Sequence, residues 1–326
     1  MAAMTRSLSD IENKVKAASS VIHDIRAAIR CSIVGQATLV DRLLIGLLTD
    51  GHILLEGPPG LAKTLMVRRL SECLDLVFQR IQFTPDLLPA DLLGAEIYHP
   101  RTGEFSTRKG PLFTQILLAD EINRAPPKVQ SALLEAMAER QITIGGETHL
   151  LPSPFLVLAT QNPLEQEGTY PLPEAQADRF MMKCRVDYPT EAEEKEILFR
   201  QDMQQTSLNP VAGPEDIMRC KEALALVHLD PLIVDYLLHL VRATRSDSSV
   251  SRFLSVGASP RASLALMNSS KAHAFLKGRS YVTPDDVKAM THDVLRHRIL
   301  LSFEAEAQGM NADWVIDKIL QTTRAP

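Results

Sequence analysis

The stretch "HILLEGPPGLAKTLMVRRL", residues 52–70, constrains the fold of this chain more than any other segment. A short apolar run ends at Gly57, a loop rich in glycine and proline follows, and apolar residues at helical spacing begin after it. Gly57, four intervening residues, and then Ala62, Lys63 and Thr64 have the spacing of a phosphate-binding loop, in the strand-to-helix context that this motif requires. The segment therefore predicts a nucleotide site; the alternative is a plain turn between a strand and a helix.

The residues of this loop have distinct expected roles. Backbone N–H groups at the start of the helix would point at phosphate oxygens. Lys63 would reach the β- and γ-phosphates, and the hydroxyl of Thr64 would bind Mg²⁺. Ala62 stands where the general pattern has glycine, and its methyl group is tolerated at negative φ but clashes at positive φ. The expected nucleotide-binding residues are Gly57, Pro58, Pro59, Gly60, Leu61, Ala62, Lys63 and Thr64.

Strand-like and helical segments alternate through the first part of the chain. The apolar runs "QILLAD", "FLVLAT" and "MMKCRVDY" are separated by helical stretches such as "KVQSALLEAMAER". This alternation predicts an α/β fold, with a parallel sheet and helices on both of its faces. Two helices, over residues 9–30 and 37–48, are expected before the first strand.

Beyond Tyr188 the strand-like runs stop, and signals for helix starts take their place. Thr190 with Glu193 three residues later has the pattern of a capping box, and Thr283 followed by Pro284 marks another helix start. We therefore expect a nucleotide-binding αβα domain over residues 1–189 and a smaller all-helical domain over residues 190–326.

Two acidic residues, Asp120 and Glu121, end the apolar run "QILLAD". Neighbouring carboxylates at a strand tip are unfavourable unless a cation or another polar site uses them. Asp120 fits the acid that holds Mg²⁺ in a phosphate-loop enzyme, and Glu121 fits the base that polarises the attacking water. The alternative, a pair of solvated loop acids, is weakened by the phosphate-binding loop that precedes them.

Asn162 follows the run "FLVLAT" and should lie at the same edge of the sheet as Asp120. Ligands collect at the carboxyl edge of parallel sheets. Asn162 is therefore placed to orient the water or to contact the γ-phosphate. The alternative is an ordinary turn asparagine before a proline.

Charge and composition exclude several other classes of protein. The formal net charge is −5, whereas dedicated nucleic-acid binders are basic. The four cysteines lie far apart with no CxxC pair, which argues against a structural zinc site. The longest apolar runs are too short to cross a bilayer, and the N-terminus has a helical pattern instead of a signal peptide. These features predict a cytoplasmic protein.

Several motifs together resemble the MoxR family of AAA+ ATPases. They are "GPPGLAKT", "ADEINRAPPKVQSALLEAM", "ATQNP", "LPEAQADRF" and "GASPRA", and the resemblance extends from "IVGQ" almost to the end of the chain. It implies an AAA+ core followed by a helical lid. The alanine at position 62 departs from the general phosphate-binding loop but agrees with loops of the MoxR type.

The resemblance also implies roles for three residues outside the loop and the strand tips. Gln36 would lie near the adenine, Arg179 would be an arginine finger that reaches the γ-phosphate in a neighbouring subunit, and Arg261 would be the sensor arginine of the lid. From chemistry alone, Arg179 is equally consistent with a rim residue paired with Asp178, and Arg261 with a surface residue. Whether Arg261 serves its own subunit or the next stays open.

Further expectations follow from the same resemblance. The protein would form a homo-oligomeric ring, a hexamer, that uses ATP and Mg²⁺ to remodel, assemble or activate a client protein, for which a partner with a metal-binding domain is one candidate. Two inserts, "LLGAEIYHPRTGEFSTRKGPLF" and "RQITIGGETHLL", have the glycine-containing turns of hairpins. In the family such hairpins face the central channel or a partner; the alternative is a pair of solvated loops.

Three rival functions use the same core. A nucleic-acid motor is disfavoured by the net charge, although Arg101, Arg108 and Lys109 in the first insert keep it open. A magnesium-chelatase subunit would share the ATPase domain. A nucleotide-gated scaffold with little turnover is disfavoured by the presence of Glu121.

Overall fold

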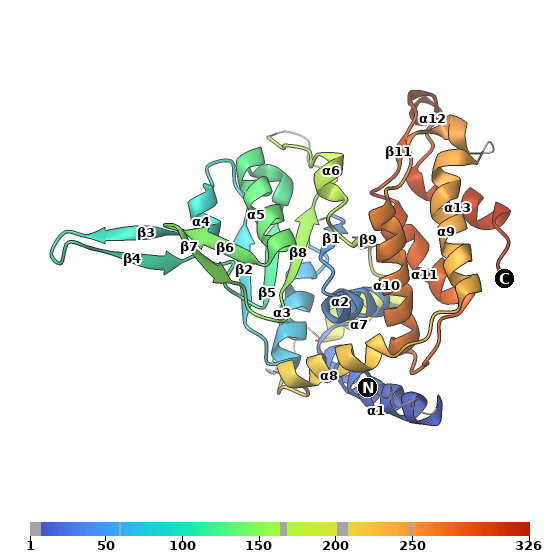
Figure 1. Cartoon of the computed structure of the whole chain (residues 1–326), viewed down its shortest axis with the longest axis horizontal. Coiled ribbons are helices and arrows are strands. Elements are labelled where there is room, and N and C mark those ends of the chain that lie inside the picture. The colour runs from blue at the N-terminus through green and yellow to red at the C-terminus, as the bar shows by residue number, and fades with distance from the viewer. Residues whose placement is uncertain (1–7, 59, 164–167, 201–207, 248–249) are drawn as a thin grey trace, which may run out of the picture.

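The computed structural model describes residues 8–58, 60–163, 168–200, 208–247 and 250–326. A core is built on a five-stranded parallel sheet in the order β2-β5-β8-β1-β9, and a helical lid lies beside it (Figure 1). The predicted α/β class, with a helical part after the sheet, is confirmed. The strands of this sheet are β1 (Ile53–Glu56), β2 (Phe78–Gln82), β5 (Ile116–Asp120), β8 (Leu156–Gln161) and β9 (Met182–Arg185).

Helices cover both faces of the sheet, and successive residues of β1 show how. Ile53 and Leu55 pack into a core shared with α1 (Leu8–Ser32), α2 (Ala37–Thr49), α3 (Lys63–Cys73) and the lid. Leu54, pointing the other way, packs with α4 (Pro89–Leu93) and α5 (Pro127–Glu139). All three are buried, as expected for an inner strand of a doubly covered parallel sheet.

One strand of the sheet, β2, was not predicted. Its sequence "FQRIQ" lacks the continuous apolar run of the inner strands, and no side chain in it is fully buried. It lies at the edge of the sheet and pairs only with β5, so polar side chains are tolerated there. This omission matters because β2 carries two residues that contact the candidate site.

Both predicted hairpins are present. The first pairs β3 (Gly94–His99) with β4 (Glu104–Lys109), and the second pairs β6 (Gln141–Ile144) with β7 (Glu147–Leu150). The β3–β4 hairpin projects well beyond the body of the core (Figure 1). Its aromatic pair, Tyr98 and Phe105, is 52% and 66% exposed.

The lid follows β9 and is helical, as predicted, apart from a short ribbon of β10 (Leu254–Val256) and β11 (Leu300–Leu301). The predicted capping box forms, since Glu193 accepts a hydrogen bond from Thr190 N at 2.8 Å. At the second predicted helix start, Asp286 accepts a hydrogen bond from Thr283 N at 2.8 Å. The remaining helices, with α6 preceding β9, are α6 (Glu174–Ala177), α7 (Glu191–Arg200), α8 (Pro214–Ala225), α9 (Pro231–Ser246), α10 (Pro260–Leu276), α11 (Pro284–Leu295), α12 (Phe303–Ala307) and α13 (Ala312–Thr322). Among the residues described here, no helix combines the length and apolar character of a membrane span.

The lid is fastened to β9, the other edge strand of the sheet. Arg298 donates hydrogen bonds to the carbonyl oxygens of Phe180 at 2.6 Å and Met181 at 2.9 Å, and Arg296 donates to that of Lys183 at 2.7 Å. Two lid arginines thus donate to backbone carbonyls in the edge strand and in the two residues before it. The lid is therefore held against the core through the main chain.

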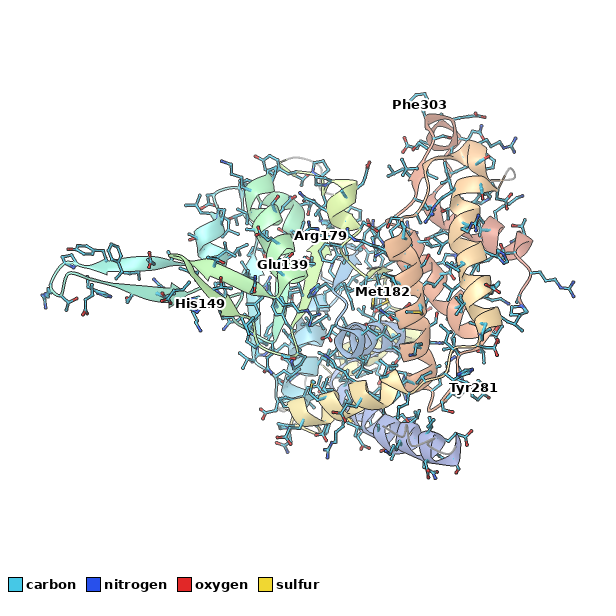
Figure 2. The ribbon with its side chains drawn as sticks, in the orientation of Figure 1. Glu139, His149, Arg179, Met182, Tyr281 and Phe303 are labelled. Atoms are coloured by element: carbon cyan, nitrogen blue, oxygen red, sulfur yellow. The ribbon has the colours of Figure 1, made fainter. Side chains whose placement is uncertain are left out.

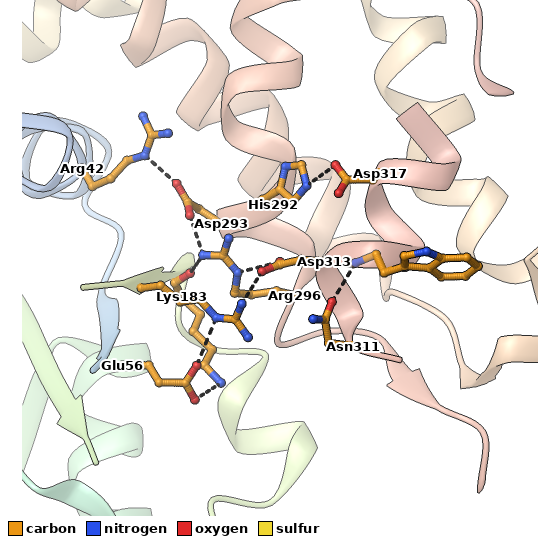
Figure 3. A network of polar contacts seen from close by, with 11 residues as sticks. Arg42, Glu56, Lys183, His292, Asp293, Arg296, Asn311, Asp313 and Asp317 are labelled. Carbon is orange, nitrogen blue, oxygen red and sulfur yellow. Dashed lines mark hydrogen bonds and ion pairs between the residues drawn. The ribbon is translucent and has the colours of Figure 1, made fainter. Parts of the chain in front are cut away.

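An ion-pair network continues this junction toward the phosphate-binding loop (Figure 3). Glu56, the last residue of β1, pairs with Lys183 at 2.6 Å, and Arg185 pairs with Asp313 of α13 at 2.6 Å. Asp313 also accepts a hydrogen bond from Arg296 Nε at 3.0 Å. Charged side chains therefore connect the residue before the loop to two helical segments of the lid.

Candidate active site

The phosphate-binding loop leaves β1 at Gly57 and enters α3 at Lys63. A Cβ atom on Gly57 would lie 2.6 Å from the carbonyl oxygen of Val186, so only glycine fits this position. Lys63 Nζ donates a hydrogen bond to Gly57 O at 2.6 Å and thus folds back over the loop. Of the eight predicted binding residues, Pro59 lies outside the described residues.

Ala62 has φ 53° and ψ 20°, which is the left-handed conformation. The expectation that its methyl group is tolerated rested on a negative φ, and that condition does not hold. A residue with a Cβ atom costs about 1–2 kcal/mol in this region. The loop therefore carries backbone strain directly before Lys63, at a position where glycine would be free of it.

Asp120 and Thr160 meet at the carboxyl ends of β5 and β8. The hydroxyl of Thr160 donates to Asp120 Oδ1 at 2.5 Å and accepts a hydrogen bond from the backbone N–H of Glu121 at 2.8 Å. Arg80 of β2 pairs with Asp120 Oδ2 at 2.6 Å, and its side chain is 48% exposed. One carboxylate oxygen is therefore fixed by the sheet, whereas the other faces an exposed cation.

Glu121 also has a left-handed backbone, with φ 57°, where the chain turns out of β5. Its Oε2 accepts a hydrogen bond from Gln82 Nε2 at 2.7 Å and pairs with Arg124 Nε at 3.0 Å. Arg80 donates to Gln82 Oε1 at 3.2 Å, which leaves the amide nitrogen of Gln82 directed at Glu121. Both predicted acids are thus held by side chains of β2.

The pKa of Lys63 reports how these groups converge. Burial lowers the pKa of its ammonium group, and the carboxylates of Asp120 and Glu121 act in the opposite direction. The three residues that motif spacing assigned to phosphate, metal and water therefore lie within electrostatic reach of one another. Thr64 follows Lys63 in the first turn of α3 and is partly buried.

Asn162 and Gln36 lie at the same edge of the sheet. Asn162 follows the last residue of β8 and is partly buried. Gln36 Nε2 donates to the carbonyl oxygen of Asp187 at 3.1 Å, one residue from the carbonyl that approaches Gly57. The structure thus places both predicted residues beside the loop.

Arg179 lies beside α5, near Glu139 (Figure 2). The exposed side chain donates from Nη1 to the carbonyl oxygen of Leu134 in α5 at 2.9 Å. It lines a cavity of about 480 Å³ together with Glu135, Glu139 and other residues of α5 and α6. Because α5 and α3 cover opposite faces of the sheet, Arg179 and its own phosphate-binding loop lie on different sides.

The strand register gives the same separation. Met181 N donates to His52 O at 2.8 Å, so the chain after Arg179 reaches β9 beside the start of β1. The loop leaves the other end of β1, where Glu56 pairs with Arg185. Roughly 13 Å of strand, at 3.3 Å per residue, lies between these two ends.

Arg261 lies with Arg179, away from the loop. Its Nη1 is 3.6 Å from Asp178 Oδ2, and the side chain is 59% exposed. Asp178 accepts its shortest hydrogen bond, at 2.7 Å, from Arg298 of the lid. The predicted site residues thus form two groups, one around Lys63 and one around Asp178.

Several residues that contact these groups were not predicted, among them Arg80, Gln82, Thr160 and Arg298. The two residues on β2 have little local signal, since "FQRIQ" places two apolar residues among polar ones without the strict alternation of a half-buried strand. Thr160 is the last residue of the predicted strand "FLVLAT", so its position was available but its hydroxyl was overlooked. Arg298 meets Asp178 across 120 residues, and no local pattern reports that contact.

Comparison with known proteins identifies the family. Residues 52–182 match the ATPase family associated with various cellular activities, and residues 246–319 match the AAA lid domain. The chain is 47% identical to the chaperone MoxR1 of Mycobacterium tuberculosis, over 94% of this chain and 83% of the relative. It is 32% identical to the protein MoxR of Paracoccus denitrificans, over 86% and 88% of the two chains.

A solved structure agrees with these relatives. A crystal structure from Cytophaga hutchinsonii superimposes with a TM-score of 0.91 and 45% identity, over 98% of this chain and 99% of the other. The match covers the core and the lid together. The chain therefore belongs to the MoxR family of AAA+ proteins and is an ATPase.

Proposed function

We propose that this ATPase forms a homo-oligomeric ring, a hexamer, in which each nucleotide site takes residues from two subunits, and that hydrolysis drives remodelling of a client protein. One observation carries the proposal. Lys63, Asp120 and Glu121 converge at the edge of the sheet where the phosphate-binding loop lies, whereas Arg179 lies beside α5, on the face of the sheet opposite to α3. A finger in that place has no short route to its own site and must act on a neighbour.

The phosphate-binding loop and Gln36 bind the nucleotide in this proposal. Backbone N–H groups of residues 60–64 would face the phosphates, helped by the N-terminus of α3. Lys63 exchanges its bond to Gly57 O for the β- and γ-phosphates. Gln36, beside Asp187, is placed for the adenine.

The residues present fit Mg²⁺. A hydroxyl from Thr64 and a carboxylate from Asp120 are hard oxygen donors of the kind that this cation prefers. Asp120 Oδ2 pairs with Arg80, whose side chain is half-exposed and can turn away. Mg²⁺ would neutralise charge on the β- and γ-phosphates.

Glu121, together with Arg179 and Arg261, catalyses hydrolysis in this proposal. Glu121 accepts the proton of the attacking water once it leaves Gln82 and Arg124, and Asn162 orients that water. Arg179 stabilises the charge that develops on the γ-phosphate of the neighbouring subunit. Arg261, next to Asp178, belongs to the same side and serves the same neighbouring site.

The client contacts the ring through its hairpins. The β3–β4 hairpin presents Tyr98 and Phe105, whose ring centroids lie 5.1 Å apart, well outside the core. Exposed aromatic side chains on a projecting element are suited to a protein surface. One relative is named a chaperone, and a client with a metal-binding domain is one candidate for this chain. We place this activity in the cytoplasm.

A nucleic-acid motor is the rival with a specific observation behind it. Arg101, Arg108 and Lys109 lie on the same hairpin, but Glu96 and Glu104 lie there too. DNA should therefore leave the rate of ATP hydrolysis unchanged. Stimulation by DNA would favour the motor over the chaperone.

Two variants test the proposed site. Lys63→Ala should abolish nucleotide binding, because the charge that offsets the β- and γ-phosphates is lost, whereas Lys288→Ala on the lid should bind normally. Nucleotide titration distinguishes them. Unchanged ATP affinity in Lys63→Ala would defeat the assignment of the loop.

Mixing variants tests the shared site. Arg179→Ala should bind ATP but hydrolyse it slowly, since a finger supplied in trans contributes roughly 10³–10⁵ in rate. A mixed ring of Arg179→Ala and Lys63→Ala rebuilds one complete site at the interface where an intact loop meets an intact finger, so activity should return. Mixed rings that stay inactive would place the action of Arg179 within its own subunit.

A further inference from the structure

The carboxylate of Asp178 lies between Arg179 and the lid. It accepts hydrogen bonds from Arg298 Nε at 2.7 Å and from Ser259 Oγ at 3.0 Å, and Arg261 approaches to 3.6 Å. All three partners belong to the lid. The side chain of Asp178 is 16% exposed and that of Arg298 only 2%, so this contact is largely removed from water.

The guanidinium of Arg298 also donates hydrogen bonds to the main chain on both sides of Arg179. Arg298 Nη2 donates to the carbonyl oxygens of Asp178 at 3.1 Å and Phe180 at 2.6 Å. The peptide before Arg179 and the residue after it are therefore both tied to the lid. The lid consequently sets where the backbone of Arg179 lies.

Asp178 fixes Arg261 as well, by two routes. Ser259 is the N-cap of α10: its hydroxyl accepts a hydrogen bond from Arg261 N at 3.2 Å while it donates to Asp178. The side chain of Arg261 in turn pairs with Asp178. One carboxylate thus connects to Arg179 through the chain and to Arg261 through a cap and an ion pair.

We propose that Asp178 is a positioning residue that holds Arg179 and Arg261 as one unit, so that both meet the nucleotide of the neighbouring subunit together. It rests on the proposed shared site and adds that the lid–core contact of one subunit governs hydrolysis in the next. Asp178 touches no residue of its own phosphate-binding loop among its described partners. Its loss should therefore impair the neighbour's site and leave its own intact.

Asp178→Asn is the variant of choice, because it keeps the side-chain volume and one acceptor oxygen but loses the charge that pairs with Arg298 and Arg261. Nucleotide affinity should stay unchanged. The rate of ATP hydrolysis in homogeneous rings should fall roughly 10- to 100-fold, the scale expected when reacting groups are misplaced by about 1 Å. A rate equal to that of the unaltered protein would overturn the proposal.

Mixed rings then give the direction of the effect. Asp178→Asn mixed with Lys63→Ala should regain activity, because one subunit supplies an intact loop and the other an intact positioning unit. Mixed with Arg179→Ala it should stay slow, since both subunits lack that unit. Recovery with Arg179→Ala, or no recovery with Lys63→Ala, would overturn the proposal. A structural defect alone would not produce this asymmetry.

Further experiments distinguish a failure of the shared site from a failure of the role of Asp178 alone. The pair Arg179→Ala and Lys63→Ala, run alongside, tests the shared site itself: if it recovers while the Asp178→Asn mixtures do not, only the role of Asp178 fails. Should Asp178→Asn prove unfolded by circular dichroism, Ser259→Ala should show the same asymmetry with a smaller loss. Asp313→Asn weakens the same lid–core junction near Arg185, and it should lower the melting temperature while keeping most of the turnover.

Discussion

Two ion pairs of similar geometry behave differently at the two groups of site residues. Asp120 beside the phosphate-binding loop and Asp178 at the lid junction are each 16% exposed, and each lies within 2.7 Å of an arginine. The arginines differ: the side chain of Arg80 is 48% exposed, whereas that of Arg298 is 2% exposed. The first pair can therefore be exchanged for a ligand at little cost, and the second cannot.

This difference separates the residues near the nucleotide site from the residues that hold the lid against the core. Near the loop, Lys63, Asp120 and Glu121 are held by partners that a bound nucleotide can replace. At the junction, Arg298 satisfies an acid and several main-chain carbonyls at once. Changes near the loop should accordingly alter catalysis with little effect on folding, whereas changes at the junction should also alter stability.

The largest effect expected near the loop comes from Glu121→Gln. The amide keeps the size of the side chain but cannot accept a proton, so hydrolysis should fall roughly 10²–10⁴-fold while ATP binding persists. Steady-state turnover and nucleotide titration measure the two quantities, with Glu306→Gln on the lid as a control. Near-normal turnover would move the base elsewhere.

Arg298→Ala should give the largest loss of stability. Removing one partner of a buried pair leaves the other unpaired, and the free energy of unfolding should fall by about 3–5 kcal/mol. Arg261→Ala is the matched control, because this exposed arginine pairs with the same Asp178 and should cost at most about 1 kcal/mol. Equal losses in urea unfolding would erase the contrast between exposed and buried pairs.

His52 should make the junction end of the sheet sensitive to pH. The ring is buried, accepts a hydrogen bond from Val157 N at 3.0 Å and contacts Met137 O at 3.2 Å, and burial lowers its pKa to about 4. Above pH 6.5 the ring is neutral whether the chain is folded or unfolded. As the pH falls from 6.5 to 4 only the unfolded chain takes up the proton, so the folded state loses about 3 kcal/mol.

Unfolding measured between pH 4 and 7 tests this dependence. His52→Gln keeps an acceptor and a donor without titrating, so its free energy of unfolding should change less with pH than that of the unaltered protein. The difference between the two profiles removes the contribution of carboxylates and of His297, whose pKa burial also lowers. Parallel profiles would contradict the assignment.

The smallest effect should come from Ala62→Gly. Glycine relieves a left-handed conformation that costs about 1–2 kcal/mol, but it also makes the unfolded chain more flexible by about 0.4–1 kcal/mol. The net gain in stability should therefore stay below about 1 kcal/mol, with ATP affinity within a few-fold. Ala62→Val, in contrast, should lower both, because a β-branched side chain tolerates positive φ poorly. Opposite signs would mean that the loop is not strained.

The residues near the loop were predictable because their signals are local. Lys63, Thr64, Asp120 and Glu121 each follow a strand pattern by a fixed spacing, and the fold follows from the same alternation. The positive φ of Ala62 could not be inferred, because the sequence states only that a methyl group is present. Its conformation depends on how α3 leaves the loop.

The contacts of the junction could not be predicted for a different reason. Asp178 contacts Arg298, which lies 120 residues later in the sequence, and Arg261, which lies 83 residues later. Contacts between residues so far apart in the sequence produce no periodic pattern. Strand β2 was missed because an edge strand needs no apolar run. The contacts of Arg80 and Gln82, which lie on this strand, were therefore missed as well. Motif spacing thus located the side chains that converge beside the loop, but not the side chains that hold them.

The central claim is that a complete hydrolytic site needs two subunits, and turnover per subunit against protein concentration tests it most directly. Each sample should be divided between an ATPase assay and a measurement of mass in solution, from dilutions where only monomers exist up to full assembly. The account predicts that turnover per subunit rises with the assembled fraction and then becomes constant. Turnover that is the same for monomers as for rings would contradict it, because Arg179 would then have to reach the nucleotide of its own chain.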